Sequence, residues 1–406
     1  MDELKSDRVT SFEGLSELRD VVKSVDGASL DKKVFVGFDG FVDKIKRAVR
    51  SKQNNETVYY DSIREFADRI ALAAGKSGQI QMDTVRTKFG GNAPILASTL
   101  GKLGMHNYCL GSMGYPGRQE VFAKMHPLVQ PISALNPGLS DAIEFSDGKI
   151  ILSELEVFES YDWSHIMNVV GLERLTQVIG ECALVAFVDW ANLPHASDIW
   201  QGMLNDVIKP LKRHDFYFLF DLCDPSKKTT QQIDEVLDLV SSFSGYGKVT
   251  LGLNENETLR IWCALNGHEL GAVDSGKLPS VREAGDALYK TMCIDALLVH
   301  PIDRSLLFKE HSVIELQGRL VTSPKVLTGG GDNLNAGYCL GLLHQLSEPQ
   351  CMLLGMAASG AYIENGLNPD CKDIVNYLDR WIGELRQKEG QYMQTDTGDH
   401  IFHSPA

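Results

Sequence analysis

Short, continuous runs of β-branched and aromatic residues alternate along this chain with segments of helical periodicity. The strand-like runs are KVFVGF (33–38), ALVAFVDW (183–190), DFYFLFDL (215–222), KVTLGL (248–253) and DALLVH (295–300). Their apolar positions are consecutive, which is typical of strands covered on both faces. Helical spacing fills most of the intervals, at 93–103, 198–213, 230–243, 255–265, 281–292, 333–346 and 371–388. Strand followed by helix, repeated in this way, predicts an α/β fold with a doubly wound, Rossmann-like, mainly parallel sheet.

Two stretches interrupt this alternation and predict a second, smaller sheet. Residues 140–158 alternate between apolar and polar side chains around an Asp147-Gly148 turn, which is typical of a hairpin, and residues 79–89 also have an extended pattern. Such strands would shade a ligand cleft at the carboxyl ends of the main strands. We expect a helical extension over 1–30, one main domain over 31–390 with β lid segments near 45–60, 79–89 and 140–158, and a poorly ordered tail over 391–406.

The charge balance excludes several classes of partner. The 406 residues carry a formal net charge of -15, and a field of this sign repels nucleic acids and anionic membranes. The N-terminal segment is charged and lacks an apolar core, and no run has the length of a membrane span. The eight cysteines show no C-x-x-C pair, which predicts buried, reduced thiols without disulfides. We therefore expect a cytoplasmic, enzyme-like protein whose ligand is a small molecule.

Three consecutive glycines, Gly329, Gly330 and Gly331, stand immediately before Asp332 and a helical segment. Consecutive glycines allow several backbone N–H groups to converge on one point, where the start of the helix adds its positive end. Asp332 beside this point would accept a proton from an attacking hydroxyl. In the alternative interpretation the glycines form a turn and Asp332 caps the helix. The local pattern alone leaves both interpretations open.

Further polar residues are expected at the same edge of the sheet. Gly90, Gly91 and Asn92 lie between an extended segment and a helix, where they would contact a polar ligand or simply form the junction. Asp39 and Asp43 follow the first strand, where carboxylates accept hydrogen bonds from sugar hydroxyls, or form a solvated acidic turn.

Asn254 and Glu257 lie three residues apart where a strand gives way to a helix. This spacing predicts a capping box, in which each side chain accepts a hydrogen bond from the backbone of the other residue. The functional alternative is that Glu257 holds Mg²⁺ through water, because Mg²⁺ retains much of its hydration shell.

Taken in order, these motifs resemble those of the PfkB, or ribokinase-like, family of carbohydrate kinases. The family's G-x-G-D matches Gly329 to Asp332, its N-x-x-E matches Asn254 and Glu257, and its double glycine matches Gly90 and Gly91. The chain departs from the family pattern at Ile95, at Val326-Leu327 and at VHPIDRSLLF, which begins at Val299. The likeness extends from the first predicted strand to the last predicted helix.

The resemblance implies a ribokinase-like core with a small β lid, and transfer of the γ-phosphoryl group of ATP to a sugar, a sugar phosphate or a related alcohol. It implies Asp332 as base, the amides of Gly329–Gly331 as anion hole, and Glu257 with Asn254 as organisers of nucleotide and Mg²⁺. The acceptor would contact Asp39, Asp43, Gly90, Gly91 and Asn92, and a homodimer through the lid is a further expectation. The segment GFDGFVD also resembles the opening of ADP-dependent sugar kinases, so ADP remains open as donor. A non-catalytic sugar sensor and a nucleoside kinase are the alternative functions.

Overall fold

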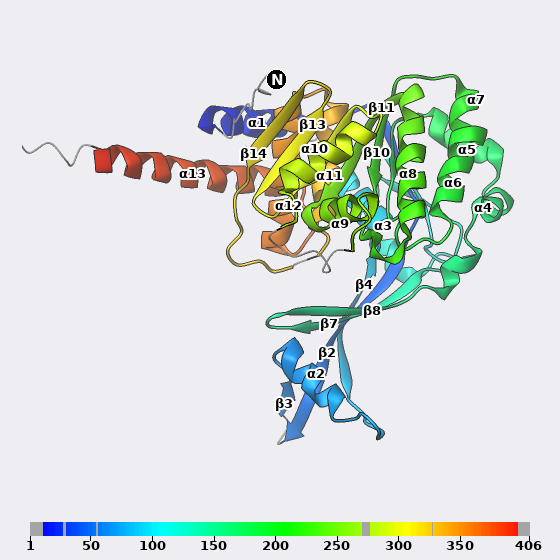
Figure 1. The fold of residues 1–406 in the computed structure, drawn as a ribbon, viewed down its shortest axis with the longest axis vertical. Coiled ribbons are helices and arrows are strands. Elements are labelled where there is room, and N and C mark those ends of the chain that lie inside the picture. Colours follow the sequence, from blue (N-terminus) through cyan, green and yellow to red (C-terminus); the bar gives the residue numbers. More distant parts are fainter. Residues whose placement is uncertain (1–10, 27–29, 54–55, 270–276, 327, 397–406) are drawn as a thin grey trace, which may run out of the picture.

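The computed structural model describes residues 11–26, 30–53, 56–269, 277–326 and 328–396. Its main body is built on a nine-stranded sheet in the order β14-β13-β12-β11-β10-β9-β1-β5-β6 (Figure 1). The strands are β1 (Lys33–Gly37), β5 (Asn107–Gly111), β6 (Val129–Ser133), β9 (Cys182–Phe187), β10 (Phe216–Asp221), β11 (Gly247–Asn254), β12 (Ala296–His300), β13 (Arg304–Lys309) and β14 (Ser312–Gln317). Pairing is parallel from β6 through β12, and β13 and β14 are antiparallel additions at one edge.

Helices cover both faces of this sheet, because neighbouring side chains of a strand point to opposite sides. In β1, Val34 and Val36 pack in one apolar core and Phe35 in the other. The Val34 side is covered by α1 (Phe12–Val25), α3 (Asn92–Lys102), α11 (Gly330–Leu343), α12 (Glu348–Asn365) and α13 (Cys371–Asp396). The Phe35 side is covered by α4 (Trp163–Val169), α5 (Leu172–Gly180), α6 (Ala196–Gly202), α8 (Thr230–Ser242), α9 (Glu255–Leu265) and α10 (Val281–Thr291). The predicted doubly wound α/β fold is confirmed.

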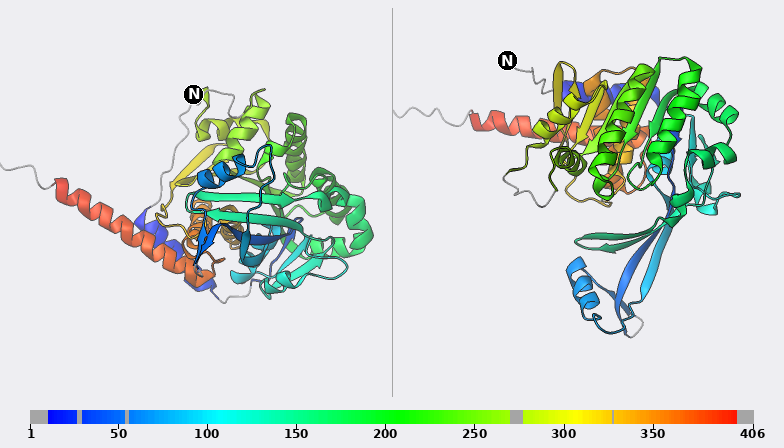
Figure 2. Two further views of the ribbon diagram at one scale, coloured as in Figure 1. Left: turned by 90° about the horizontal axis from the view of Figure 1, so that it is seen from below. Right: turned by 45° about the vertical axis from the view of Figure 1, so that its right-hand side comes forward.

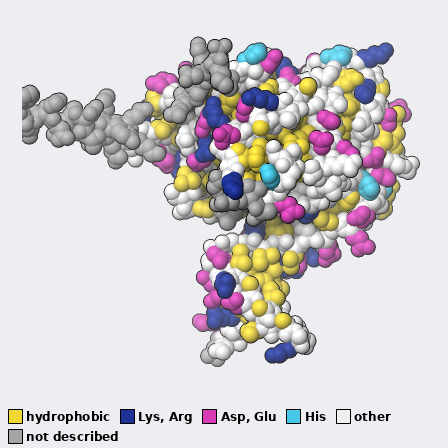
Figure 3. All heavy atoms as spheres, viewed as in Figure 1, with side chains coloured by type: hydrophobic (Ala, Val, Ile, Leu, Met, Phe, Trp, Pro, Cys, Tyr) yellow, Lys and Arg dark blue, Asp and Glu magenta, His cyan; other side chains and the backbone are white. Residues whose placement is uncertain are grey.

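A second sheet extends away from the main body as a lid (Figures 1 and 2). Its strands are β2 (Phe41–Gln53), β3 (Glu56–Tyr59), β4 (Met82–Gly90), β7 (Gly138–Phe145) and β8 (Gly148–Glu154), in the order β3-β2-β7-β8 with β4 also paired to β2. The helix α2 (Ile63–Ala71) packs on it through Phe66, which contacts Ala48 and Ile143 in a small separate core. Figure 3 shows hydrophobic side chains gathered on the lid, whose exposed members include Ile151 and Leu152.

Several elements differ from the expectations. The segment expected as one helix over 198–213 is divided into α6, a π-helical turn (Met203–Ile208) and a short α7 (Lys209–Leu211). Helix α13 continues to Asp396, past residue 390, where we expected the tail to begin. The expected extension contains α1, and residues 1–10 and 397–406 lie outside the described residues.

The state of the cysteines and the lengths of the helices agree with what the sequence predicts. All eight cysteines are free thiols; Cys293 is exposed, Cys223 is half-buried and the others are buried. Within the described residues, no helix is both long enough and apolar enough to span a membrane.

Close packing between α11 and α12 depends on Gly337. A Cβ atom at this position would lie 2.5 Å from the carbonyl oxygen of Leu354, a backbone atom that cannot move alone. We predict that Gly337→Ala lowers the free energy of unfolding by about 1–3 kcal/mol despite the higher helix propensity of alanine. Urea denaturation measures this change. Gly383→Ala in α13 is the matched control, because a Cβ there meets no atom within 4 Å and should be neutral or stabilising; equal effects of the two substitutions would contradict the packing argument.

Candidate active site

Acidic side chains gather at the carboxyl edge of the main sheet, beside the starts of α3 and α11. Asp39 follows β1, Asp189 follows β9, Asp221 ends β10 and Glu257 lies in the first turn of α9, after β11. All four are buried, as is Asp332 in α11. The parallel strands bring these residues together, since their carboxyl ends meet at one edge.

The glycine triplet begins α11. Gly329 is the N-cap residue and has φ +86°, a left-handed conformation that favours glycine, and Gly330 is the first helical residue. The interpretation of Asp332 as the N-cap residue is therefore wrong, because Gly329 holds that position and Asp332 is the third residue of the helix, within its first turn. The first amides of α11 have no partners earlier in the helix, which makes this end a site for an anion.

The Asp332 carboxylate is buried with little compensation. Its Oδ1 atom has no hydrogen-bond partner among the described residues, and the side chain of Asn92 is a hydrogen-bonding neighbour of the carboxylate. Burial raises the pKa of Asp332 well above its usual value, and the negative charges of Asp221 and Asp189 raise it further. These surroundings make the Asp332 carboxylate more basic than one in water.

The double glycine allows two aspartates to approach the start of α3. A Cβ atom at position 91 would lie 2.5 Å from Asp39 Oδ2, and one at position 90 would overlap the carboxylate of Asp43. Asp43 lies on β2, the first strand of the lid, and its carboxylate is partly exposed. Any larger residue at either position would displace one of these carboxylates.

Both carboxylate oxygens of Asp39 are occupied by hydrogen bonds within the protein. Its two oxygens accept hydrogen bonds from the backbone N–H groups of Asn92 and Ala93, each at 2.7 Å, and the side chain is fully buried. Asp39 thus holds the turn that presents Asn92 to Asp332. This geometry gives Asp39 a positioning role.

Asp189 and Asp221 extend the acidic cluster below Asp332. Asp189 has φ +59° and accepts a hydrogen bond from Asn192 Nδ2 at 2.6 Å, while Asp221 accepts one from Asn335 Nδ2 at 2.8 Å. Asp189 also faces Asp39, and a hydrogen bond can join these two carboxylates only when one of them is protonated. Burial raises the pKa of Asp189 to about 6.

Asn254 and Glu257 form the predicted capping box. Asn254 Oδ1 accepts from the Glu257 N–H and Glu257 Oε2 accepts from the Asn254 N–H, both at 2.9 Å. Burial and the nearby Asp221 raise the pKa of Glu257 to about 8, so this carboxylate lacks a compensating cation. The described residues contain no cluster of three or more metal-ligating side chains. A Mg²⁺ ion here would take most of its ligands from phosphate and water, as Mg²⁺ usually does.

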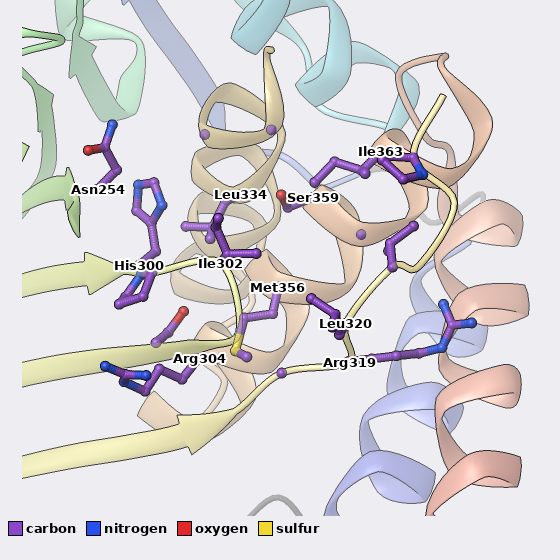
Figure 4. A pocket seen from close by; sticks show the side chains of 18 of the residues that line it. Asn254, His300, Ile302, Arg304, Arg319, Leu320, Leu334, Met356, Ser359 and Ile363 are labelled. Atoms are coloured by element: carbon purple, nitrogen blue, oxygen red, sulfur yellow. The ribbon is translucent and has the colours of Figure 1, made fainter. Parts of the chain in front are cut away.

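An apolar slot of about 520 Å³ opens beside the glycine triplet (Figure 4). Its walls include His300 at the end of β12, Ile302 just after it, Leu320, and Met356 and Ser359 from α12, and Asn254 lies at its end. Ile302 and Leu320 are strongly exposed apolar side chains, which would be covered by a flat ligand. The segment that departs from the family pattern, from Val299, thus forms one wall of this slot.

Some residues of the site were not recognised in the sequence. Lys88 on β4 and Lys149 on β8 bring positive charge from the lid toward Asp43, and Tyr362 of α12 packs beside Gly329. Their positions depend on strand register and on tertiary packing. The double-glycine segment was the one available signal for Lys88, which lies two residues before Gly90.

Comparisons with known proteins show the family of this chain. A model of the prokaryotic ketohexokinase family matches residues 13–381. A ketohexokinase from Haloferax volcanii is 25% identical over 354 residues, which are 86% of this chain and 92% of that protein.

Solved structures share the fold at low sequence identity. A carbohydrate kinase from Agrobacterium tumefaciens has a TM-score of 0.57 and 16% identity, covering 86% of this chain and 97% of its own. Arabidopsis thaliana ribokinase complexed with ribose and ATP has a TM-score of 0.57 and 17% identity, covering 86% and 98%. A putative ribokinase II from E. coli in complex with ATP and Mg²⁺ has a TM-score of 0.57 and 10% identity, covering 86% and 100%. The resemblance to ribokinase-like carbohydrate kinases is confirmed.

The positioning role of Asp39 predicts a large stability effect. Asp39→Ala leaves the buried amides of Asn92 and Ala93 without acceptors, so we expect the free energy of unfolding to fall by about 2–4 kcal/mol in denaturant titrations. Asp162→Ala is the matched control, because Asp162 caps α4 through the His165 N–H at 2.7 Å but is less buried. That substitution should cost about 1 kcal/mol. Equal losses in the two variants would argue against a special role for Asp39.

The raised pKa of Asp189 predicts that the stability of the protein depends on pH. Its pKa rises from an ordinary 3.8 to about 6 in the folded state, so the folded protein binds more protons than the unfolded chain in this interval. Stability contributed by Asp189 is therefore present below pH 3.8 and is lost as the pH rises to about 6. Asn tolerates the left-handed backbone, and Asp189→Asn should raise the free energy of unfolding at pH 7 by up to about 3 kcal/mol. Thermal melts from pH 4 to 7 measure this; parallel curves for the two proteins would contradict it.

Proposed function

Because this chain belongs to the prokaryotic ketohexokinase family, we propose that it is an ATP-dependent kinase whose acceptor is a ketohexose. The observation that carries this proposal is the unpartnered Oδ1 atom of buried Asp332, beside the free amides at the start of α11. A base and an anion site in this arrangement are what phosphoryl transfer to a hydroxyl requires.

The proposed reaction is an in-line displacement at the γ-phosphorus. The acceptor hydroxyl oxygen attacks phosphorus as the bond to the β,γ-bridging oxygen breaks, and the electron pair of that bond leaves with ADP. Asp332 accepts the hydroxyl proton during the attack. The amides of Gly329, Gly330 and Gly331 donate to phosphoryl oxygens and offset their charge.

The donor is proposed to occupy the apolar slot. The slot is lined by Ile302 and Leu320 and also by the glycine triplet. A nucleotide whose base lies between the apolar walls would therefore have its phosphates at the start of α11. Asn254, at the end of the slot, and Glu257 are proposed to orient Mg²⁺ through water. The ion, when bound with nucleotide, neutralises phosphate charge; Glu257 supplies the negative charge that holds its water.

The acceptor is proposed to bind between the lid and the start of α3. The carboxylate of Asp43 and the side chain of Asn92 provide hydrogen-bond acceptors and donors for sugar hydroxyls, while Gly90 and Gly91 keep the backbone close. Asn92 also neighbours Asp332, so a hydroxyl bound to it lies next to the base.

Nucleotide consumption over a panel of ketohexoses, aldohexoses, sugar phosphates and nucleosides tests the proposal, with ATP or ADP as donor and Mg²⁺ present. We expect ATP consumption that depends on a ketohexose. Asp332→Asn should lower kcat by a factor of about 10²–10⁴, since it removes the base without changing the shape of the side chain. Asp238→Asn on the exposed side of α8 is the isosteric control and should retain the wild-type rate.

Circular dichroism and calorimetry separate the possible outcomes. A folded Asp332→Asn variant that binds sugar and nucleotide but turns over slowly supports the role of base. Near-native turnover in that variant would refute it. Sugar binding without turnover in the wild-type protein would favour a sensor, and consumption that depends on a nucleoside would favour a nucleoside kinase.

A further inference from the structure

Lid residues place positive charge above the buried carboxylates at the edge of the main sheet, which form the floor of the site. We propose that Lys88 contacts the phosphoryl group during its transfer. This inference rests on the proposed kinase function and adds a catalytic residue to it. It would make the lid a participant in the chemistry as well as a cover for the acceptor.

Strand register brings Lys88 to the reacting groups. In the antiparallel pair of β4 and β2, Lys88 lies directly opposite Asp43, so the two side chains share one face of the lid. Two residues later, Gly90 packs against the Asp43 carboxylate at the entrance to α3. Lys88 is therefore fixed close to the position proposed for the acceptor.

The Lys88 ammonium group is poorly compensated. Its Nζ atom lies 4.0 Å from Asp43 Oδ2, too far for a hydrogen bond, and it donates no hydrogen bond to any other described residue. The side chain is half-buried, and this burial lowers the pKa of Lys88, while Asp43 and Asp332 oppose that effect. Three N–H donors in a partly dry site are thus available to an anion that enters between lid and floor.

The floor of the site has little positive charge of its own for a phosphoryl group. The buried carboxylates Asp39, Asp189, Asp221, Glu257 and Asp332 all lie there. Two arginines line the nucleotide slot, but Arg304 pairs with Asp303 and Glu315, and Arg319 pairs with Glu364 and Glu384. Backbone amides offset part of the phosphoryl charge, and a lid cation would supply a full positive charge.

The other lid cations near the site have different positions. Lys149 Nζ donates to Thr328 Oγ1 at 3.0 Å, which joins the β7–β8 hairpin to the loop before the glycine triplet. Arg86 lies two residues before Lys88 on the same face of β4 and contributes to the electrostatic surroundings of Tyr362. Lys88 is the one of these three with both a close approach to Asp43 and an electrostatic interaction with Asp332.

In the proposed step, the ammonium group of Lys88 donates hydrogen bonds to non-bridging oxygens of the γ-phosphoryl group and keeps its proton throughout. The bonds that form and break are those of the in-line displacement, and the hydroxyl proton still goes to Asp332. The contribution of Lys88 is electrostatic, and it grows as charge accumulates in the transition state.

Steady-state kinetics of Lys88→Met, with a ketohexose and ATP-Mg²⁺, tests this role. Methionine keeps most of the side-chain length and removes the charge, so we expect kcat to fall by a factor of about 10²–10³ with the KM for sugar changed by less than about threefold. Lys44→Met is the matched control. Lys44 pairs with Thr87 and is adjacent to Asp43 in β2, so it points to the opposite face of the lid and should leave kcat unchanged.

Chemical rescue distinguishes a catalytic role of Lys88 from a structural one, because added cations restore activity only if the missing charge is the cause of the loss. In Lys88→Ala, added methylammonium or ethylammonium should raise kcat by a factor of about ten or more, since a small cation can occupy the vacated volume. Lys88→Arg should retain more activity than Lys88→Met.

The outcomes distinguish this inference from the proposed function. A raised KM for sugar with unchanged kcat in Lys88→Met, and no rescue of Lys88→Ala, would show that Lys88 only holds Asp43 and would overturn the inference while leaving the kinase intact. Near-native kinetics in Lys88→Met would also overturn it. A failure of the proposed function itself appears in the wild-type protein, as absence of sugar-dependent ATP consumption.

Discussion

The two hydrogen bonds from the start of α3 to the carboxylate of Asp39 connect every part of this site. Asp39 follows β1, an interior strand of the main sheet, and its oxygens accept hydrogen bonds from the amides of Asn92 and Ala93. These bonds fix the Gly90-Gly91 turn, at which β4 of the lid ends. Through the side chain of Asn92 they also reach Asp332. The buried carboxylate of Asp39 thus connects the main sheet, the lid and Asp332.

This arrangement concentrates negative charge in a buried place. Burial raises the pKa values of the acids at the sheet edge, because it removes the water that would solvate their charged forms, and their mutual repulsion raises these pKa values further. The same repulsion is useful when a cation or a proton donor enters, since each lowers the energy of the carboxylates that it meets. Mg²⁺ and an acceptor hydroxyl, which the proposed function requires, would offset this repulsion.

Local patterns predicted much of the fold and part of the site. The five continuous apolar runs are strands, and the glycines before Asp332 do begin a helix. Helix α12 was not predicted because it is buried on nearly all sides, so its sequence has no amphipathic period. The short β5 and β6 lack a continuous run of β-branched residues. The use of Asp39 was beyond prediction, because it depends on contact between residues 53 positions apart.

Lys88 illustrates why the lid and the chemistry belong together. A lysine on the main body would be drawn permanently into the acidic floor, and its charge would be neutralised before a phosphoryl group arrived. On β4 the ammonium group is held 4.0 Å from Asp43, close enough to be attracted but without a hydrogen bond. The strand pair of β2 and β4 carries both Lys88 and Asp43. In the proposed mechanism, binding of the acceptor and delivery of positive charge to the phosphoryl group therefore depend on the same two strands of the lid.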